Sequence, residues 1–395
     1  MSVVLCTLKG VKPLSSVIAR DHVREPLFAI VPYFNPWRWK SRVKHTERAI
    51  RHFAESGAVV VLVEVAFNRR EAVFADSGLD GTAANCSIHG EFRHKYIGLR
   101  TKDELWLKEN AINLGVQSLP YDWQQICWLD SDVHFVRPNW VGECIQKLQH
   151  YSWLQMFSQA RDLSPTYEMM PETYPHANGV SFLQSYLDGD LDANLKKGWT
   201  RPPDWQKVTA DLAQVQGDIS RLSSDVQKVL SDLEDDYYGG AGPRRVFPGL
   251  AWACTREAFD AVGGLLDVAI WGGADWHMSH ALVNRTENMM HSALHPAYKN
   301  VVTAWHRMSQ TAKIRGNVGV MEGAVFHSWH GKKTSRGYGD KHRVLARLQF
   351  DPTQHLKRDS QGLWQLHDDG SDTFVALRES FRRIALERNE DSIDV

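Results

Sequence analysis

Two runs of apolar residues, joined by an amphipathic segment, constrain the fold of this chain most strongly. Residues 27–31 and 58–65 are apolar almost throughout, which is typical of strands buried on both faces of a sheet. Residues 39–56, between them, carry an apolar and a basic face and are predicted to form a helix. A strand, a helix and a second strand in this order indicate parallel pairing. We therefore predict a doubly wound α/β sheet, in which ligands bind beyond the carboxyl ends of the strands.

A third apolar run ends in two closely spaced carboxylates. Residues 124–135 are predicted to form a strand, and residues 126–129 lead directly into Asp130, Ser131 and Asp132. Carboxylates at the end of a buried strand are costly unless a positive charge lies between them. A divalent cation such as Mg²⁺ or Mn²⁺ accepts oxygen ligands and keeps open positions for phosphate groups. The pattern predicts a metal site in an enzyme that handles nucleotides, although a solvated turn at a strand end has the same sequence.

Two further motifs follow this pair along the chain. The first is Trp271-Gly272-Gly273-Ala274-Asp275-Trp276, and the second is Phe326-His327-Ser328-Trp329-His330-Gly331. Their order resembles that of the metal-dependent glycosyltransferases of the GT-A fold, especially the inverting branch of galactosyltransferases and chondroitin-type synthases. Phage-encoded glycosyltransferases are similar more loosely. Residues 29–35 resemble the first strand and nucleotide-binding turn of this fold. Residues 102–116 are predicted to form a helix, and residues 106–115 within it resemble the helix before the metal strand.

The resemblance covers residues 27–345 and implies both a fold and an activity. The fold would be a Rossmann-like, mixed and mainly parallel sheet flanked by helices. The activity would be the inverting transfer of a hexosyl or pentosyl group from a nucleotide-sugar, most simply a UDP-sugar, to an acceptor hydroxyl, with Mn²⁺ or Mg²⁺ as cofactor. Three linked motifs are far more specific than any one of them.

The resemblance also assigns roles to the charged residues of the motifs. Asp132 would be the stronger metal ligand, and Asp130 would reach the ribose, or the metal through a water molecule. A late histidine would complete the metal site; His330 is favoured, but the spacing does not exclude His327. Because an acceptor hydroxyl has a very high pKa, inversion needs a carboxylate base, which Asp275 would supply.

Other residues are expected to contact the substrates. The predicted nucleotide and donor contacts are Pro32, Tyr33, Asn35, Glu64, Lys108, Asn113 and Ser131. The predicted sugar and acceptor contacts are Trp252, Trp271, Gly272, Gly273 and Trp276, since glycine pairs allow close approach and indole rings offer flat apolar faces. The chain departs from its commonest relatives at Ala274, where an acidic residue often stands, so their substrates do not transfer directly.

Two alternatives use the same residues. Asp275 would instead be the N-cap of a helix over residues 276–282. A zinc site would instead combine Asp275 with His277 and His280, which are three residues apart and so share one helix face. No glutamate has the spacing of a metalloprotease base relative to these histidines.

Residues 313–347 are strongly basic and allow three interpretations. They form a solvated face, a lid over the donor diphosphate that includes Lys332, Lys333 and Arg336, or a contact with the phosphates of a nucleic acid. The last would suit a hydroxymethylated base in DNA as acceptor, with a saccharide as the other candidate. Lysine and arginine (46) nearly balance aspartate and glutamate (47), so the net charge weighs against a nucleic-acid partner.

The remaining segments predict accessory structure. Apolar residues recur in steps of four and three from Val208 to Leu233, so residues 203–236 are expected to be a helical insertion, either a coiled-coil arm for self-association or a helix packed on its own domain. We expect one catalytic domain over residues 1–350 and a packing segment over residues 351–395, with a helix from about Thr373. The five scattered cysteines are expected to be buried free thiols.

No apolar run is long enough for a transmembrane helix, and we expect a cytoplasmic protein, in the host cell if phage-encoded. Two other functions remain open. One is a different metal-dependent enzyme of phosphate chemistry, such as a nucleotidyltransferase. The other is a catalytically silent carbohydrate-binding or scaffold protein.

Overall fold

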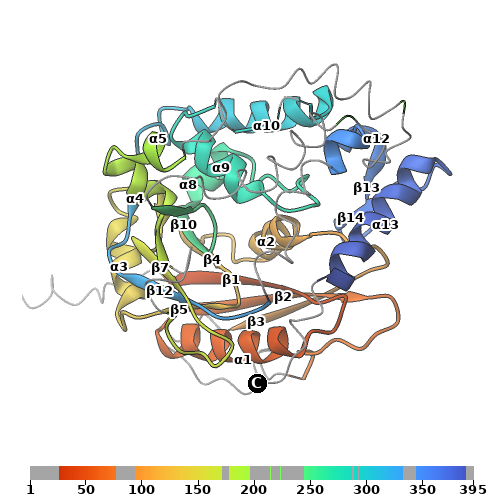
Figure 1. Cartoon of the computed structure of the whole chain (residues 1–395). Helices are drawn as coiled ribbons and strands as arrows, with labels where there is room; N and C mark the ends of the chain where they lie inside the picture. Colours follow the sequence, from red (N-terminus) through yellow and green to blue (C-terminus); the bar gives the residue numbers. More distant parts are fainter. Residues whose placement is uncertain are drawn as a thin grey trace, which may run out of the picture.

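The computed structural model of the chain describes residues 26–76, 94–170, 178–195, 244–286, 289–291, 293–331 and 344–387, with residues 214 and 223 singly. Its centre is a seven-stranded sheet in the order β11-β6-β10-β4-β1-β2-β3 (Figure 1). The strands are β1 (Leu27–Phe34), β2 (Val59–Phe67), β3 (Lys95–Thr101), β4 (Gln125–Leu129), β6 (Trp153–Gln155), β10 (Ala251–Thr255) and β11 (Val318–Val320).

The sheet is mixed and mainly parallel, as the sequence predicts. Strand β1 pairs in parallel with β2 and with β4, and β2 pairs in parallel with β3. Strand β10 runs antiparallel to both of its neighbours, β4 and β6. The protein therefore has a Rossmann-like α/β fold.

Helices cover both faces of this sheet (Figure 1). Alternate residues of β1 enter two separate cores: Ile30 packs in the one that includes α2 (Lys108–Gln117), α9 (Ala274–Leu282) and α10 (Pro296–Ser309). Ala29 packs in the other, with α1 (Lys40–Glu55) and α3 (Trp140–Lys147). Burial on both faces explains why the strands are apolar almost throughout.

A smaller sheet and several short elements complete the main body. The five strands, in the order β5-β12-β7-β8-β9, are β5 (Val133–Phe135), β12 (Ala324–His327), β7 (Gln159–Asp162), β8 (Asn178–Ser181) and β9 (Arg245–Phe247). The short helices are α4 (Phe182–Leu187), α5 (Leu191–Asn194) and α8 (Arg256–Ala261).

The C-terminal segment packs against the main body. It contains α12 (Pro352–His355), the hairpin β13 (Leu356–Arg358) and β14 (Trp364–Leu366), and α13 (Asp372–Glu387). Leu356, Leu366 and Phe381 belong to the same hydrophobic core as α2 and α9. The helix expected near Thr373 is therefore present, one residue earlier.

Two predicted boundaries were wrong. The helix expected from residue 102 begins at Lys108, because the Trp106 amide donates to the Ile270 carbonyl (2.8 Å) and so joins another part of the chain. The strand expected over residues 124–135 ends at Leu129. The Val133 amide donates back to the Asp130 carbonyl (3.2 Å), and this turn passes the chain into the smaller sheet.

The strand order identifies where a ligand can bind. From β1 the chain passes through α1 to β2 and β3 on one side, and then through α2 to β4 on the other side. A crevice opens beyond the carboxyl ends of two strands where the chain changes direction in this way. Here that point lies between β1 and β4.

The sequence also led to expectations about the cysteines, the heptad segment and membrane-spanning helices. Cys127, Cys144 and Cys254 are buried free thiols, as expected, whereas Cys6 and Cys86 lie outside the described residues. The heptad segment, residues 203–236, lies outside them too, apart from two single residues. In the part of the chain that is described, no helix combines the length and apolar character needed to cross a bilayer.

Candidate functional site at the ends of β1 and β4

A cavity of about 160 Å³ opens at this point of the sheet. A water molecule needs about 10–15 Å³ of such space, so the cavity can hold about ten of them, or part of a small ligand. Ten of the predicted site residues line it: Pro32, Lys108, Asp130, Ser131, Asp132, Gly272, Gly273, Asp275, His327 and His330. The three sequence motifs therefore meet in one cavity.

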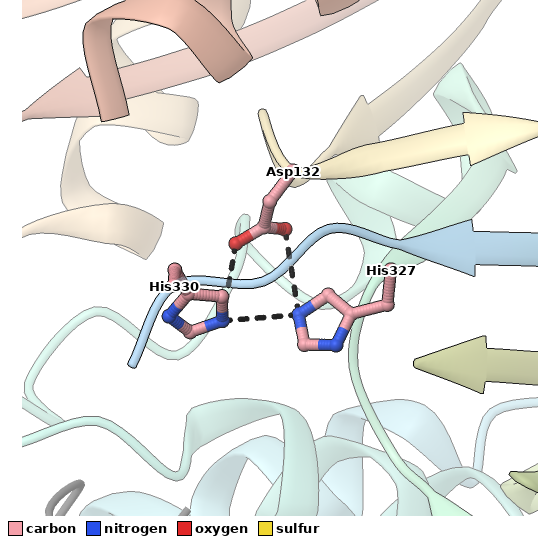
Figure 2. Close-up of side chains that lie close together, drawn as sticks. All are labelled: Asp132, His327 and His330. Atoms are coloured by element: carbon pink, nitrogen blue, oxygen red, sulfur yellow. Dashed lines mark hydrogen bonds and ion pairs between the residues drawn. The ribbon is translucent and has the colours of Figure 1, made fainter. Parts of the chain in front are cut away.

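Asp132, His327 and His330 form a compact cluster in this cavity (Figure 2). The Nε2 atoms of the two histidines are 3.1 Å apart. Nε2 of His330 lies 3.4 Å from Oδ2 of Asp132, and Nε2 of His327 lies 3.7 Å from Oδ1. Both histidines thus face the same carboxylate. His327 and His330 therefore both lie beside Asp132, and neither is favoured over the other by position.

The spacing of this cluster suits a bound cation. Metal–ligand bonds of about 2.0–2.1 Å place neighbouring ligand atoms about 2.9–3.4 Å apart, close to the distances observed here. Oδ1 of Asp132 is also buried and accepts no hydrogen bond from the described residues. In that part of the chain, no other group of three or more His, Cys, Asp or Glu side chains converges in this way.

The negative charge of Asp132 and the positive charge of a protonated histidine stabilise each other in this cluster. Burial acts to lower the pKa of His327, but Asp132 and Asp162 outweigh it and raise the pKa to about 10. Burial acts to raise the pKa of Asp132, but His327 and His330 hold it well below its usual range. In the absence of a cation, a proton on His327 therefore supplies the positive charge that the carboxylate requires.

A second carboxylate, that of Asp162, orients His327 through the ring nitrogen that faces away from Asp132. Nδ1 of His327 lies 2.6 Å from Oδ1 of Asp162, and Oδ2 of Asp162 is 3.4 Å from a guanidinium nitrogen of Arg245. This contact holds a proton on Nδ1, so that Nε2 is directed at Asp132. Carboxylate partners of this kind commonly orient histidines that bind metals.

Asp130 is engaged differently from Asp132. The ammonium of Lys108, in the first turn of α2, lies 2.5 Å from Oδ1 of Asp130. Burial acts to lower the pKa of Lys108, but Asp130 and Asp275 outweigh it and raise the pKa, so the ammonium stays charged. Lys108 is buried and salt-bridged instead of being a solvated surface lysine.

Asp275 lies in the first turn of α9, opposite the backbone of Gly249. The N-cap of α9 is Gly273, whose left-handed conformation (φ 91°) suits glycine, so Asp275 does not take the alternative role of N-cap. Oδ1 of Asp275 accepts the Trp276 amide at 2.9 Å. A Cβ atom at position 249 would lie 2.2 Å from Oδ2 of Asp275, so glycine is needed there for the carboxylate to occupy this position.

Two comparisons of the sequence with known proteins found no match. The sequence matches no model of a protein family, and no curated protein matches it. Any assignment of function therefore rests on the residues of the site and not on the fold alone.

The alternative zinc site does not assemble. Nδ1 of His277 lies 2.5 Å from the Met289 carbonyl, and Nε2 of the same ring lies 3.1 Å from the Tyr298 hydroxyl. Nδ1 of His280 lies 2.8 Å from the Arg285 carbonyl. These histidines connect α9 to the following loop and to α10, and they do not converge with Asp275 on one point.

Four predicted donor contacts lie outside the cavity lining and have structural partners. Asn35 accepts the Trp39 amide at 3.0 Å, and its amide group also donates to the Tyr33 hydroxyl at 3.2 Å. Glu64 accepts the amides of residues 73 and 74 and the Tyr96 hydroxyl. Asn113 exchanges two hydrogen bonds with the backbone of Leu265.

The predicted tryptophan contacts are also core residues. Trp252, Trp271 and Trp276 are each at most 4% exposed, and none of them lines the cavity. Trp271 packs against Phe381 of α13, with ring centroids 3.8 Å apart. The basic residues Lys332, Lys333 and Arg336 of the predicted lid lie outside the described residues.

The cavity includes residues that sequence reasoning did not select. The charged ones are Arg42, Glu109 and Arg245, and the aromatic ones are Phe34, Trp106 and Phe247. Trp106 and Glu109 lie within the segment that resembles the helix before the metal strand, but their spacing does not mark them as site residues. Arg42 follows β1 by eight residues, and Arg245 lies in a different sheet, so only the fold brings them here.

Proposed function

We propose that this chain is a metal-dependent inverting glycosyltransferase of GT-A type, which moves a sugar from a nucleotide-sugar, most simply a UDP-sugar, to an acceptor hydroxyl. The supporting observation is that one cavity combines a cation cluster of Asp132, His327 and His330 with a separate carboxylate, Asp275. Glycosyl transfer with inversion needs both: positive charge for a diphosphate leaving group and a base for the acceptor. A saccharide and a hydroxymethylated base in DNA both remain candidate acceptors.

The donor set favours Mn²⁺ over Mg²⁺. Imidazole nitrogen suits transition metals, whereas Mg²⁺ prefers oxygen ligands and retains several water molecules. Asp132, His327 and His330 would hold the ion and leave positions open for phosphate oxygens. When bound, the ion supplies positive charge beside the diphosphate as negative charge develops there.

Two arginines add to this positive charge. Arg42 and Arg245 both line the cavity, and Arg42 is close enough to Asp132 to help lower the pKa of that carboxyl. Guanidinium groups suit phosphate oxygens because they present several N–H donors in one plane. They would bind the donor diphosphate together with the cluster.

Asp275 would act as the base. The acceptor oxygen forms a bond to the anomeric carbon of the sugar, the bond from that carbon to the diphosphate oxygen breaks, and the hydroxyl proton passes to the Asp275 carboxylate. Lys108 lies close enough to Asp275 for this carboxylate to help raise the Lys108 pKa, so a charged ammonium would stand near the base.

A calorimetric titration tests the donor site. UDP, and in parallel GDP, is titrated into the protein with and without Mn²⁺. We expect UDP to bind only with Mn²⁺, and Asp132→Ala to weaken binding by at least about tenfold, because it removes the charged ligand of the cluster.

Asp122→Ala is the matched control, because Asp122 is exposed and lies before β4, outside the cavity lining. It should bind UDP like the wild type. If the wild type bound neither nucleotide in the presence of Mn²⁺, the proposed function would be wrong.

A further inference from the structure

Glu109 is a buried carboxyl group that the proposed reaction leaves without a role. It lies in the first turn of α2, next to Lys108, and only 4% of its surface is exposed. It nevertheless lines the same cavity as Asp275 and the metal cluster. Glutamate is rarely buried to this extent unless another group compensates for the cost.

No group of the described protein provides full compensation. The neighbouring ammonium of Lys108 is paired with Asp130 at 2.5 Å. Among the described residues, the Glu109 side chain accepts a hydrogen bond from its own backbone amide. The carboxyl therefore retains hydrogen-bonding capacity beside the cavity, and a buried polar group in that state is costly.

The surroundings also determine which form of the carboxyl is present. Burial raises its pKa, Lys108 lowers it less, and Asp275 raises it further, to about 8. Near pH 7 the group is therefore mostly a neutral acid. A neutral carboxyl both donates and accepts a hydrogen bond, which complements a sugar hydroxyl, itself a donor and an acceptor.

The neighbouring charged residues have other roles. Ala274, between the glycine pair and Asp275, is fully buried, does not line the cavity and carries no polar side-chain atom. Asp275 would accept the proton of the acceptor hydroxyl, and the ammonium of Lys108 is paired with Asp130. Glu109 is thus the carboxyl still able to bind a hydroxyl group without taking part in the proton transfer.

We propose that Glu109 binds a hydroxyl group of the transferred sugar and so helps to select the donor. This inference rests on the proposed function and adds a specificity-determining residue to it. A site that hydrogen-bonds a substrate hydroxyl discriminates strongly against donors without it, because the buried partner is then unsatisfied.

Two variants of nearly equal size test the proposal. Glu109→Met keeps the length of the side chain and removes its hydrogen bonds, whereas Glu109→Gln keeps a donor and an acceptor. The probes are UDP, UDP-glucose and UDP-galactose, each titrated with Mn²⁺. For whichever UDP-sugar the wild type binds more tightly, we expect Glu109→Met to weaken binding about tenfold and Glu109→Gln to recover part of it, while UDP binding stays within about twofold.

Thermal unfolding separates this role from a structural one. Because Glu109→Met removes a buried polar group that the protein does not fully satisfy, its melting temperature should equal or exceed that of the wild type. The inference is overturned if Glu109→Met binds the UDP-sugar as tightly as the wild type, or weakens UDP and the UDP-sugar equally. Failure of the proposed function looks different: the wild type would then bind no UDP with Mn²⁺.

Discussion

At the scale of single residues, the metal cluster depends on a side chain that would not touch the metal. His327 has two ring nitrogens, and the contact of Nδ1 with Asp162 directs Nε2 to Asp132. Asp162 is 6% exposed and also pairs with Arg245, so its own position is well defined. It is a positioning residue for the cluster.

Asp162→Asn should weaken Mn²⁺ binding about 10–100-fold, the range typical for loss of a partner that orients a metal ligand. The amide can present its NH₂ group to Nδ1, which would favour the tautomer whose proton lies on Nε2. Electron paramagnetic resonance of free Mn²⁺ during a titration measures the affinity. Asp122→Asn, an exposed change of the same kind, should leave it unaltered; an equal affinity in Asp162→Asn would show that Asp162 does not position His327.

At the scale of elements, helix α1 and strand β5 are joined by a histidine pair next to the site. The rings of His52 in α1 and His134 in β5 stack with centroids 3.7 Å apart. Nε2 of His52 also accepts the Phe135 amide at 3.2 Å, which requires that nitrogen to be unprotonated. Burial, and then the charge of His134, lowers the pKa of His52 to about 4.

This contact predicts a loss of stability in acid. His52 is neutral in the folded protein, whereas its unfolded pKa is about 6.5, so the unfolded state gains protons first as the pH falls from about 6.5 to 4. The free energy of unfolding should therefore decrease over that window, by about 1 kcal/mol from this residue after allowance for partial exposure.

Urea unfolding of the wild type and of His52→Gln, at about pH 7 and about pH 5, measures this contribution. Gln accepts the same hydrogen bond but does not titrate, and buried His277 remains in both proteins. The wild type should lose about 1 kcal/mol more than the variant. Equal losses would mean that His52 does not contribute to acid sensitivity.

At the scale of the whole molecule, the C-terminal segment supports two walls of the cavity. The Trp364 amide donates to Asn110 of α2 at 2.9 Å, and the Leu366 amide donates to Asp103 at 3.0 Å. Phe381 of α13 packs on Trp271, directly before the glycine pair and Asp275. Residues almost at the end of the described chain therefore hold α2 and the start of α9 in place.

Phe381→Ala should lower the free energy of unfolding by about 3 kcal/mol, because it leaves a cavity beside a buried indole ring. Val375→Ala, on the same helix but 48% exposed at the native residue, should change it by less than about 0.5 kcal/mol. Chemical denaturation of both variants checks this. Similar small effects would indicate that α13 contributes little to the core.

The sequence by itself determined the local parts of this protein. Apolar runs of strand length predict β1, β2 and β4, since burial on both faces leaves a continuous apolar pattern. Polar residues directly after such runs predict where a ligand binds, and Asp130 and Asp132 line the cavity expected there; Asp275, His327 and His330, selected from the resemblance of their motifs, line it as well. These features depend on neighbours in the chain, so a pattern can reveal them.

Only the tertiary structure decided which distant residues meet. Asp162 reaches His327 because β7 and β12 pair, and their register places the two residues opposite each other. The same packing keeps Glu64 and Trp252 out of the cavity and brings Glu109 into it. Contacts between residues far apart in the chain depend on strand order and on packing, and neither leaves a periodic trace in the sequence.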